Sequence, residues 1–389
     1  MKVDILIAST GEHSLITEIK DGLHINLDDF HFSLDVIQQA HLTQHFSGII
    51  GTDDSTVELA TLAAQKLGLI HNPPYSAKLT QRKDLARACL KHHNCIVPNH
   101  RVIKLLEPIE EQLIDITWPC VIKPLNMSAS RGVIRVNNIS ECLIACKRVT
   151  KIISVSDNVF EQRHLLLEEY IDGAEVAFEA YLENGQLHQL AIFEKPNPLV
   201  GPYFEETIYV TPCQLKASVQ KHIKQRVSEA CEAYGLITGP IHAELRIDSS
   251  NEAWILEVAN RSIGGDCGRT LDGSIEYFLE KLIISLAIGI SPPIPEIENA
   301  QGVMMIPIQK PGILKEIEGI ESAKKVKDIT GVSININLGN ELIPLPEGNQ
   351  YLGYIFAESD TSAQVIDALN TAHDKLTIHV MPKIKLIQD

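Results

Sequence analysis

Apolar and polar residues alternate on both sides of the polar segment "DSSNE", within residues 239–265. Alternation with a period of two is typical of half-buried strands, and a short polar break between two such runs predicts a β-hairpin. If Ile247 pairs near Ala253, Glu244 falls opposite Glu257 on the polar face of that hairpin. Like charges that face each other across two strands destabilise a sheet. The pattern therefore raises the question of what these two carboxylates do there.

The first 95 residues alternate short apolar segments with helical patterns. "VDILIAS" and "FSGIIGTD" are predicted buried strands, and "DSTVELATLAAQKLGL" is a predicted amphipathic helix with a capping box at Ser55 and Glu58. Strands that alternate with helices predict a small parallel sheet. A further helix is predicted from Lys78 to His93, after the paired prolines of "GLIHNPPYSAK".

From about residue 96 the predicted strands become longer. "WPCVIKPLNMSASRGVIRV" predicts a strand, a loop and a strand, and "EVAFEAYLENGQLHQLAIFEK" predicts a hairpin that turns at Asn184 and Gly185. "KASVQKHIKQRVSEACEAYGL" and "SIEYFLEKLIISLAIGI" are predicted helices. The proline-rich "SPPIPEIENA" indicates a linker near 291–300. The segments after it predict a compact α+β unit that ends in a helix and a strand.

Composition narrows the class of function. The chain has 389 residues, of which 44% are hydrophobic and 22% charged, so a soluble globular protein of two or three domains is expected. A net charge of −16 without a basic block argues against a nucleic-acid partner, although not against a small nucleotide. No apolar run approaches a membrane span, and eight cysteines without a CxxC pair fit a reducing compartment. We expect a cytoplasmic protein without a membrane partner.

Lys123 is the first candidate functional residue. It ends the apolar strand "PCVIK" and is followed by "NMSASRG". Such a lysine can be an edge residue whose ammonium group reaches solvent. It can also bind phosphate, because a unit charge pair at ~4 Å and an effective dielectric constant near ~20 contributes roughly 4 kcal/mol before desolvation. Loops of small residues expose N–H groups that cradle phosphate oxygens. Neither a P-loop nor a strand-linked GxGxxG is present, so a nucleotide would have to be held in this other way.

The second candidate is "LLLEEYIDGAE", in which an apolar strand runs into Glu168 and Glu169 and, after a turn, into Glu175. The acids can simply be solvated at a strand end. Alternatively, the backbone from Glu169 to Ile171 meets an adenine edge, and the Glu175 carboxylate accepts hydrogen bonds from ribose hydroxyls.

The third candidate is the pair Glu244 and Glu257. Magnesium takes hard oxygen ligands, usually one or two carboxylates together with phosphates and water. A metal between the two side chains would turn their repulsion into attraction. The alternative is a shifted register in which one glutamate pairs with His242 or Arg246.

Arg261 follows Glu257 by four residues and precedes Gly264 and Gly265. A guanidinium group can bind a carboxylate or an acyl phosphate with two hydrogen bonds. The glycines permit a close approach of the backbone to a ligand.

In chain order, these motifs resemble those of the ATP-grasp carboxylate–amine ligases. They are Lys83 in "QRKDLARACL", Lys123 with "NMSASRG", then "LLLEEYIDGAE", "HAELR" and "LEVANRSIGG". "HNPPYSAKLTQRKDLARACL", "EKPNPLVGPYFEETIYVTP" and the C-terminal "PGILKEIEGIESAKKV" and "PLPEGNQYLGYIFAES" are similar to the L-amino-acid ligases (dipeptide synthases) and carnosine-synthase-like enzymes. The resemblance covers nearly the whole chain.

The resemblance implies an α/β and α+β protein with an ATP-grasp fold, in which ATP lies between two lobes. The N-terminal parallel α/β domain would cover residues 1–95, and the small C-terminal α+β domain residues 291–389. The ATP-grasp core at 96–290 would divide into a lid lobe at about 96–167 and a second lobe at about 168–290.

The resemblance also implies roles for individual residues. Glu244 and Glu257 would hold magnesium, with manganese as the alternative. Arg261 and the backbone of Gly264 and Gly265 would face the acyl phosphate and the amino-acid carboxylate. The implied nucleotide contacts are Lys83 and Lys123 with phosphates, Ser128, Ala129, Ser130, Arg131 and Gly132 as a closing loop, Glu168, Glu169 and Ile171 with adenine, and Glu175 with ribose.

The chain departs from the family in the last metal motif. Many ATP-grasp enzymes have Glu-x-Asn there, whereas this chain has Glu257-Val258-Ala259, with the asparagine one place later at Asn260. If the strand continues, the side chain of Asn260 points to the other face. Asn260 stays a candidate metal ligand, and the coordination of a second magnesium is the open question.

The implied reaction joins a small-molecule carboxylate to an amine. The carboxylate would attack the γ-phosphate of ATP, and the amine would displace phosphate from the acyl phosphate. His242 or Glu206, in "FEET", would take the amine proton. One alternative is an ATP-grasp ligase for another substrate, similar to glycinamide ribonucleotide synthetase or biotin carboxylase. The other is a non-catalytic nucleotide-binding regulator. Enzymes of this kind are commonly homodimers.

Overall fold

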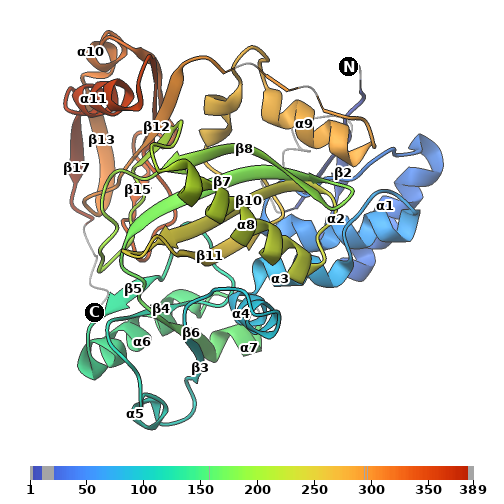
Figure 1. The fold of residues 1–389 in the computed structure, drawn as a ribbon, viewed down its shortest axis with the longest axis horizontal. Helices are drawn as coiled ribbons and strands as arrows, with labels where there is room; N and C mark the ends of the chain where they lie inside the picture. The colour runs from blue at the N-terminus through green and yellow to red at the C-terminus, as the bar shows by residue number, and fades with distance from the viewer. Residues whose placement is uncertain (1–2, 11–21, 157, 293, 296, 384–389) are drawn as a thin grey trace, which may run out of the picture.

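The computed structural model describes residues 3–10, 22–156, 158–292, 294–295 and 297–383. A lobe with a four-stranded sheet lies below a larger lobe with an eight-stranded sheet (Figure 1). The N-terminal helices lie beside both lobes (Figure 1).

The N-terminal region combines a short parallel sheet with helices. β1 (Ile7–Ser9) lies within the predicted strand "VDILIAS" but is not buried, and it pairs in parallel, as predicted, with β2 (Gly22–His24), a strand that the sequence analysis did not predict. The prediction of a strand over "FSGIIGTD" is wrong, because no described strand pairs with residues 46–53. The helices here are α1 (Phe30–Gln44), α2 (Asp54–Leu67), α3 (Pro74–Gln81) and α4 (Lys83–His92).

Two helix boundaries differ from the prediction. Arg82 has an extended backbone (φ −101°, ψ 101°), which divides the predicted helix over 78–93 into α3 and α4. The break brings the Lys83 N–H to Leu125 O of the lid lobe, at 2.8 Å. The N-cap of α2 is Asp53, whose side chain forms the capping box with Thr56 in place of the predicted pair Ser55 and Glu58. Aspartate is as good an N-cap as serine, and here it comes two residues earlier.

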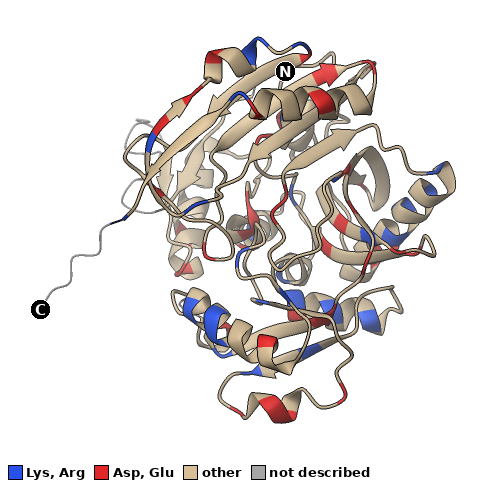
Figure 2. Ribbon diagram, turned by 90° about the vertical axis from the view of Figure 1, so that its left-hand side faces the viewer, with Lys and Arg blue, Asp and Glu red and all other residues tan. Residues whose placement is uncertain are grey.

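The lid lobe has an antiparallel sheet of order β3-β6-β4-β5. The predicted strand–loop–strand is confirmed, because β4 and β5 pair on either side of the "NMSASRG" loop. Apolar residues of α6 and the sheet form the core of the lobe. Lys and Arg appear on helices at the bottom of Figure 2, and within this lobe they lie on α6. Its elements are β3 (His100–Lys104), α5 (Ile109–Gln112), β4 (Cys120–Lys123), β5 (Ile134–Val136), α6 (Ile139–Ile153), α7 (Val159–Gln162) and β6 (His164–Glu169).

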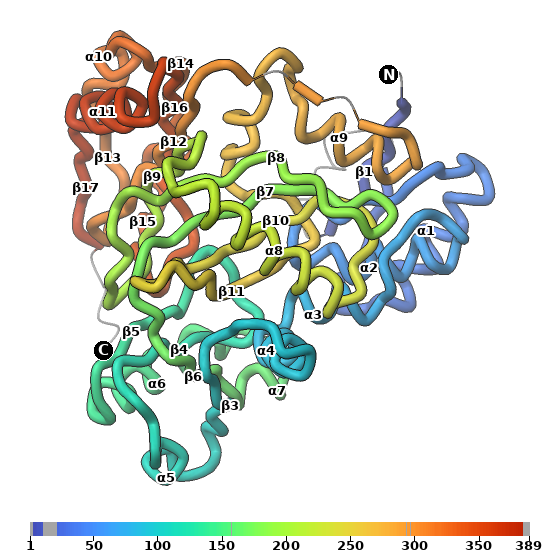
Figure 3. Tube along the Cα trace, viewed as in Figure 1, coloured from blue at the N-terminus to red at the C-terminus, as the bar shows by residue number. Residues whose placement is uncertain are grey.

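The chain returns through β6 into the large lobe (Figure 3). The predicted turn at Asn184 and Gly185 is confirmed, since both have a left-handed backbone (φ 52° and 79°) between β7 and β8. One face of the sheet packs on α8, and the other packs on α9 and the 3₁₀ helix η2. These elements are β7 (Ala174–Glu183), β8 (Gln186–Glu194), β9 (Ile208–Thr211), α8 (Ala217–Tyr234), β10 (Gly239–Ile247), β11 (Ala253–Ala259), η2 (Cys267–Leu271) and α9 (Phe278–Ala287).

The C-terminal region is α+β, as predicted, but it shares its main sheet with the second lobe. The sheet order is β11-β10-β7-β8-β9-β12-β16-β14, so three strands from beyond residue 290 extend it. The domain limits of the sequence analysis stay predictions. The elements are β12 (Ala300–Ile306), β13 (Gly312–Glu318), α10 (Ile320–Lys324), β14 (Ile329–Ile334), β15 (Glu341–Leu342), β16 (Gly353–Ser359), α11 (Ser362–His373) and β17 (Thr377–Met381), with β15, β13 and β17 in a separate sheet.

Candidate active site

Glu244 and Glu257 lie opposite each other on β10 and β11, and Ile247 pairs with Ala253. The register shifts by one residue between Glu244 and Leu245, which marks a β-bulge. Without this bulge, Glu244 would face Leu256 and not Glu257. Since a slip of one residue moves a side chain to the other face, the bulge is what places both carboxylates on one face of the sheet.

Each of the two carboxylates lies beside a lysine. Lys195 Nζ lies 3.1 Å from Glu244 Oε1, and Lys83 Nζ lies 3.3 Å from Glu257 Oε2. Opposite charges at this distance attract each other. The two lysines therefore offset the repulsion within the hairpin.

Lys195, directly after β8, is shared by three carboxylates. Its Nζ lies 2.7 Å from Glu175, 2.5 Å from Glu206 and 3.1 Å from Glu244. One oxygen from each carboxylate lies within 4.8 Å of the others, a spacing that suits a hard divalent cation. Burial raises the pKa of Glu206, and the charge of Glu244 raises it further, to about 7, against the effect of Lys195. The hydroxyl of Tyr209 donates a hydrogen bond of 2.5 Å to Glu206.

His242 faces carboxylates with both ring nitrogens. Nδ1 pairs with Glu179, and Nε2 lies 3.7 Å from Glu244. Burial lowers the pKa of His242, but Glu179 and Glu244 outweigh burial and raise the pKa to about 9. An imidazolium carries a proton on both ring nitrogens and has no site for another. This geometry favours Glu206 over His242 as a proton acceptor.

Lys83 and Lys123, the predicted phosphate-binding cations, meet at the lid lobe. Lys83 Nζ donates to Met127 O at 2.9 Å, just beyond β4, which ends at Lys123. Lys123 is buried and pairs with Glu168. Phosphate oxygens would therefore compete with protein acceptors for both ammonium groups.

Glu168 is a buried counter-ion. Its carboxylate lies 2.6 Å from Arg87 Nε and also pairs with Lys123, and its side chain is 2% exposed. Burial disfavours the charge of Glu168, but Arg87 and Lys123 hold its pKa below the usual value. The carboxylate is thus enclosed by cations, which does not fit the predicted contact with adenine. Its place in the site is to hold Lys123.

A cavity of about 500 Å³ lies along residues 170–173, which connect β6 to β7 and are called the hinge below. This volume is within the range of small-molecule sites. Glu169 and Ile171, the predicted adenine contacts, line it, and so does the indole of Trp254. The remaining lining residues come from the hinge and the β10–β11 turn: Tyr170, Asp172, Gly173, Ala174, Ile247, Asp248 and Ser249.

Glu175, the predicted ribose contact, is buried beside the hinge. Its two oxygens face cations, with Lys195 at 2.7 Å and Arg246 Nε at 3.0 Å. Arg246 also donates to Ile171 O at 2.8 Å. A ribose hydroxyl would have to share Glu175 with these cations.

Part of the backbone of the loop from Ser128 to Gly132 already forms hydrogen bonds within the protein. The Arg131 N–H donates to Ser128 O at 3.2 Å, and the Gly132 N–H donates to Pro346 O at 2.9 Å. Ala129 and Ser130 have a left-handed backbone, with φ 52° and 53°. The N–H groups of Arg131 and Gly132 are therefore already used, so the predicted phosphate contacts would fall to the first half of the loop.

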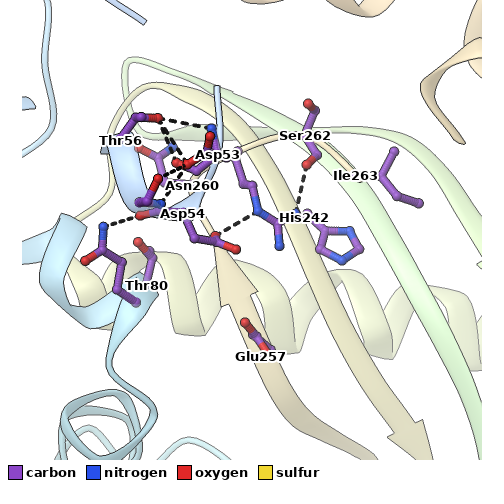
Figure 4. Close-up of polar contacts among 12 residues, drawn as sticks. Asp53, Asp54, Thr56, Thr80, His242, Glu257, Asn260, Ser262 and Ile263 are labelled. Atoms are coloured by element: carbon purple, nitrogen blue, oxygen red, sulfur yellow. Dashed lines mark hydrogen bonds and ion pairs between the residues drawn. The ribbon is translucent and has the colours of Figure 1, made fainter. Parts of the chain in front are cut away.

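Arg261 pairs with the N-terminal domain. Its Nε donates to Asp54 Oδ1 at 2.7 Å, and its Nη1 donates to Ser262 O at 2.9 Å. Figure 4 shows Asp54 at the start of α2, with Glu257 on the strand nearby. A side chain at Gly264 would meet no atom within 4 Å, so open space adjoins that backbone. At Gly265 (φ 62°) it would lie 2.9 Å from the Tyr354 hydroxyl.

Asn260 does not join the carboxylates. Its Oδ1 accepts a hydrogen bond of 2.7 Å from Asn72, and its Nδ2 donates to Pro240 O at 3.0 Å. Alternation along β11 puts Asn260 on the opposite face from Glu257. The prediction of Asn260 as a metal ligand does not fit these contacts.

The sequence analysis did not single out several charged residues of this site. Glu179 carried a visible signal, because it is a charged residue inside the apolar run "EVAFEAYLE", on the same face as Glu175. Lys195 carried a weaker one, at the end of the strand in "AIFEK". Asp54 and Arg87 lie in helices where a charged residue is ordinary.

Comparison with known families and structures agrees with this geometry. Residues 116–270 match the ATP-grasp domain, and residues 304–381 match the L-amino acid ligase C-terminal domain 2. The chain therefore contains an ATP-grasp domain. More particularly, it combines an ATP-grasp domain with the C-terminal domain of L-amino acid ligases, which confirms the predicted family and fold class.

Relatives and solved structures point in the same direction. The chain is 24% identical over 217 residues to alanine–anticapsin ligase of Bacillus subtilis, covering 52% of this chain and 45% of that protein. It is 28% identical over 165 residues to D-alanine–D-alanine ligase of Pseudomonas fluorescens, covering 41% and 47%. The crystal structure of an L-amino acid ligase from Bacillus licheniformis is similar with a TM-score of 0.79, 26% identity and coverage of 91% and 86%. N5-carboxyaminoimidazole synthetase from Staphylococcus aureus, complexed with ADP, shares the fold at 14% identity, with a TM-score of 0.69 and coverage of 95% and 90%.

The match spans about half the length of these curated relatives. Among the described residues, no helix has the length and apolar character needed to cross a membrane. The homodimer stays a prediction.

Proposed function

We propose that this protein is an ATP- and magnesium-dependent carboxylate–amine ligase that joins amino acids, or an amino acid and a small acid, and releases ADP and phosphate. The observation that carries the proposal is the pair Glu244 and Glu257 in register on adjacent strands, with Lys83 beside it. Relatives named as ligases of alanine support amino-acid substrates.

The residues present fit magnesium and ATP. Glu244 and Glu257 offer hard oxygen donors from two strands, and Glu175 adds an oxygen next to Glu244. Bound magnesium would neutralise phosphate charge. The hinge cavity and the two lid-lobe lysines offer places for the base and the phosphates. Lys195 neutralises part of the charge of the three carboxylates around it, and a bound metal would share these carboxylates with Lys195.

In the first step, a substrate carboxylate would attack the γ-phosphate of ATP and form an acyl phosphate. Such a transfer depends on positioning and on charge neutralisation. Lys83 and Lys123 would neutralise phosphate oxygens, and Arg261 would orient the carboxylate. Glu168 would hold Lys123 in place through the ion pair described above.

In the second step, an amine would displace phosphate, and its proton must leave. Glu206 would take that proton, because Tyr209 and Lys195 hold it on the face that carries Glu244. His242 would keep its own proton and act as a cation next to Glu244. Water must be excluded while the acyl phosphate exists, which requires a closed lid.

The test is ADP release, measured across single amino acids and pairs of amino acids with ATP and magnesium. We expect stimulation by pairs and its loss in Glu257→Gln, with the far-ultraviolet circular dichroism unchanged. Glu252→Gln is the matched control. Glu252 lies in the β10–β11 turn and pairs with Arg226 and His222 of α8, so this variant changes a glutamate of the same hairpin that has no proposed part in the site. Unchanged turnover in Glu257→Gln would refute the metal assignment.

A second candidate is a ligase for another amine. Phosphoribosylamine–glycine ligase of Lactococcus lactis is 21% identical over 315 residues and covers 77% of this chain and 72% of that protein. Turnover with glycine and phosphoribosylamine, but not with amino-acid pairs, would select this reading. ATP binding without turnover under any condition would select a nucleotide-binding regulator, which Ala259 in the metal motif favours.

A further inference from the structure

A C-terminal turn, residues 344–348, lies against the loop from Ser128 to Gly132. The Gly132 N–H donates to Pro346 O at 2.9 Å, and Arg131 Nε donates to Glu347 O at 3.0 Å. These bonds connect the lid lobe with a segment that follows β15. The loop predicted to close over phosphates is therefore held by the C-terminal region.

The side chain of Glu347 adds an ion pair with α6. Arg148 donates from Nε to Glu347 Oε1 at 2.6 Å and from Nη2 to Oε2 at 2.9 Å. The Arg148 and Glu347 side chains are 40% and 43% exposed. Two parallel hydrogen bonds fix the orientation of both groups, while their exposure keeps the pair weak enough to open.

Arg148 also contacts the segment that leads to Glu206. Its Nη1 donates to the Tyr203 hydroxyl, and its guanidinium carbon lies 5.1 Å from the centre of the Tyr203 ring. One side chain on the lid lobe thus joins the C-terminal turn to the segment that carries the proposed proton acceptor.

A second contact docks β5 on the same segment. The Arg135 N–H donates to Pro202 O at 2.8 Å, and Arg135 Nη1 donates to Val200 O at 2.7 Å. Gly201, with φ 91°, lies so close that a side chain there would come within 2.9 Å of Arg135 Cβ. The lid lobe is therefore held at its strand as well as at its loop.

The C-terminal turn is itself compact. The Gly348 N–H donates to Pro344 O at 2.9 Å, and a side chain at Gly348 would overlap Ile343 O at 1.8 Å. Pro346 is buried. A turn of this kind presents its carbonyl oxygens in fixed directions.

We propose that Glu347 is a positioning residue for nucleotide binding: through Pro346 O, its own carbonyl and its pair with Arg148, it holds the 128–132 loop closed, so that the C-terminal domain forms part of the lid over the ATP phosphates. The inference rests on the proposed function, because it requires the nucleotide to bind beneath this loop. This contact, which consists of one ion pair and two hydrogen bonds, can open in each catalytic turnover to admit ATP and release ADP.

The experiment measures amide hydrogen exchange in peptides that cover residues 128–133, without any substrate. The variants are Glu347→Gln, Arg148→Gln and the reversed pair Arg148→Glu with Glu347→Arg. Exchange should become about two- to fivefold faster in each single variant, as expected for an exposed ion pair, and return toward the wild-type rate in the reversed pair. Glu321→Gln, which removes an exposed carboxylate paired with Lys324 in the same domain, should have no effect.

A second readout separates positioning from a merely structural role. The Kd for ADP with magnesium, and the KM for ATP where turnover is measured, should rise by about the same factor, with a smaller change in kcat. Wild-type exchange in Glu347→Gln would overturn the proposal, and so would faster exchange without any change in nucleotide affinity. Tight ADP binding with no ligase turnover on any substrate would instead count against the proposed function and leave this inference standing.

Discussion

The guanidinium group of Arg261 donates a hydrogen bond of 2.7 Å to the carboxylate of Asp54, across 207 positions of the chain. Arg261 ends the β11 side of the candidate site, and Asp54 begins helix α2 of the N-terminal region. Both side chains are partly accessible, at 16% and 25%. The cation proposed to orient the substrate carboxylate is therefore already compensated, and an anionic ligand must compete with Asp54 or share Arg261 with it.

Asp54→Asn should tighten the binding of the carboxylate substrate. The change keeps an acceptor for Arg261 but removes the competing charge, which in a partly exposed pair contributes about 0.5–1 kcal/mol. We expect the KM for the carboxylate to fall by about two- to fivefold with a smaller change in kcat, in steady-state kinetics at saturating ATP. Asp35→Asn, which removes an exposed partner of Lys66, is the control. A higher KM in Asp54→Asn would mean that Asp54 positions Arg261 and does not compete for it.

Glu168→Gln should destabilise the fold. Arg87 is 1% exposed and Lys123 is buried, so the change leaves two buried cations without their counter-ion. Breaking a buried pair by removing one partner costs about 3–5 kcal/mol. The loss is measured as the free energy of unfolding in urea. Glu169→Gln alters a carboxylate that accepts a hydrogen bond from Asn99 at the surface, and it should cost less than about 1 kcal/mol. Equal stability of the two variants would contradict the assignment of Glu168 as a buried counter-ion.

Local patterns predicted much of the backbone of the site. Alternation around "DSSNE" predicted the β10–β11 hairpin and Asn184-Gly185 predicted the β7–β8 turn, because both depend on residues close in sequence. The exact pairing of Glu244 with Glu257 also needs the β-bulge, which alternation does not predict. Local motifs also singled out Lys123 and Arg261, and the family resemblance added Lys83; the fold brings all three to the same region.

Side-chain partners were not predictable in the same way. Lys195 collects carboxylates from β7, β10 and the segment before β9, and these meet only when the eight-stranded sheet forms. The break at Arg82 depends on Lys83 reaching Leu125 O in another lobe. Alternation alone also gives no information on whether a carboxylate such as Glu168 faces a ligand or a buried arginine.

Nucleotide binding should change the fluorescence of Trp254, whose indole lines the hinge cavity beside Glu169 and Ile171. The chain has two tryptophans, so Trp118→Phe leaves Trp254 as the single reporter. We expect titration with ADP and magnesium to shift or quench the emission, with a midpoint equal to the Kd from calorimetry. Binding by calorimetry with no change in emission would place the nucleotide outside this cavity.

The β10–β11 turn should show a pH dependence set by Asp248. Its carboxylate accepts hydrogen bonds from the Ser250 hydroxyl and, at 2.9 Å, from the indole N–H of Trp254, and these bonds lower the pKa of Asp248 from 3.8 to about 2. A pKa that is lower in the folded state means that the stabilisation is complete above about pH 4 and is lost as the pH falls through about 2. Asp248→Asn should therefore be less stable than the wild type at pH 7, and the difference in the free energy of unfolding should narrow below pH 4. In the Trp118→Phe background, the emission of Trp254 should titrate with a midpoint near 2, whereas a midpoint near 4 would show that these hydrogen bonds do not hold the ionised carboxylate in solution.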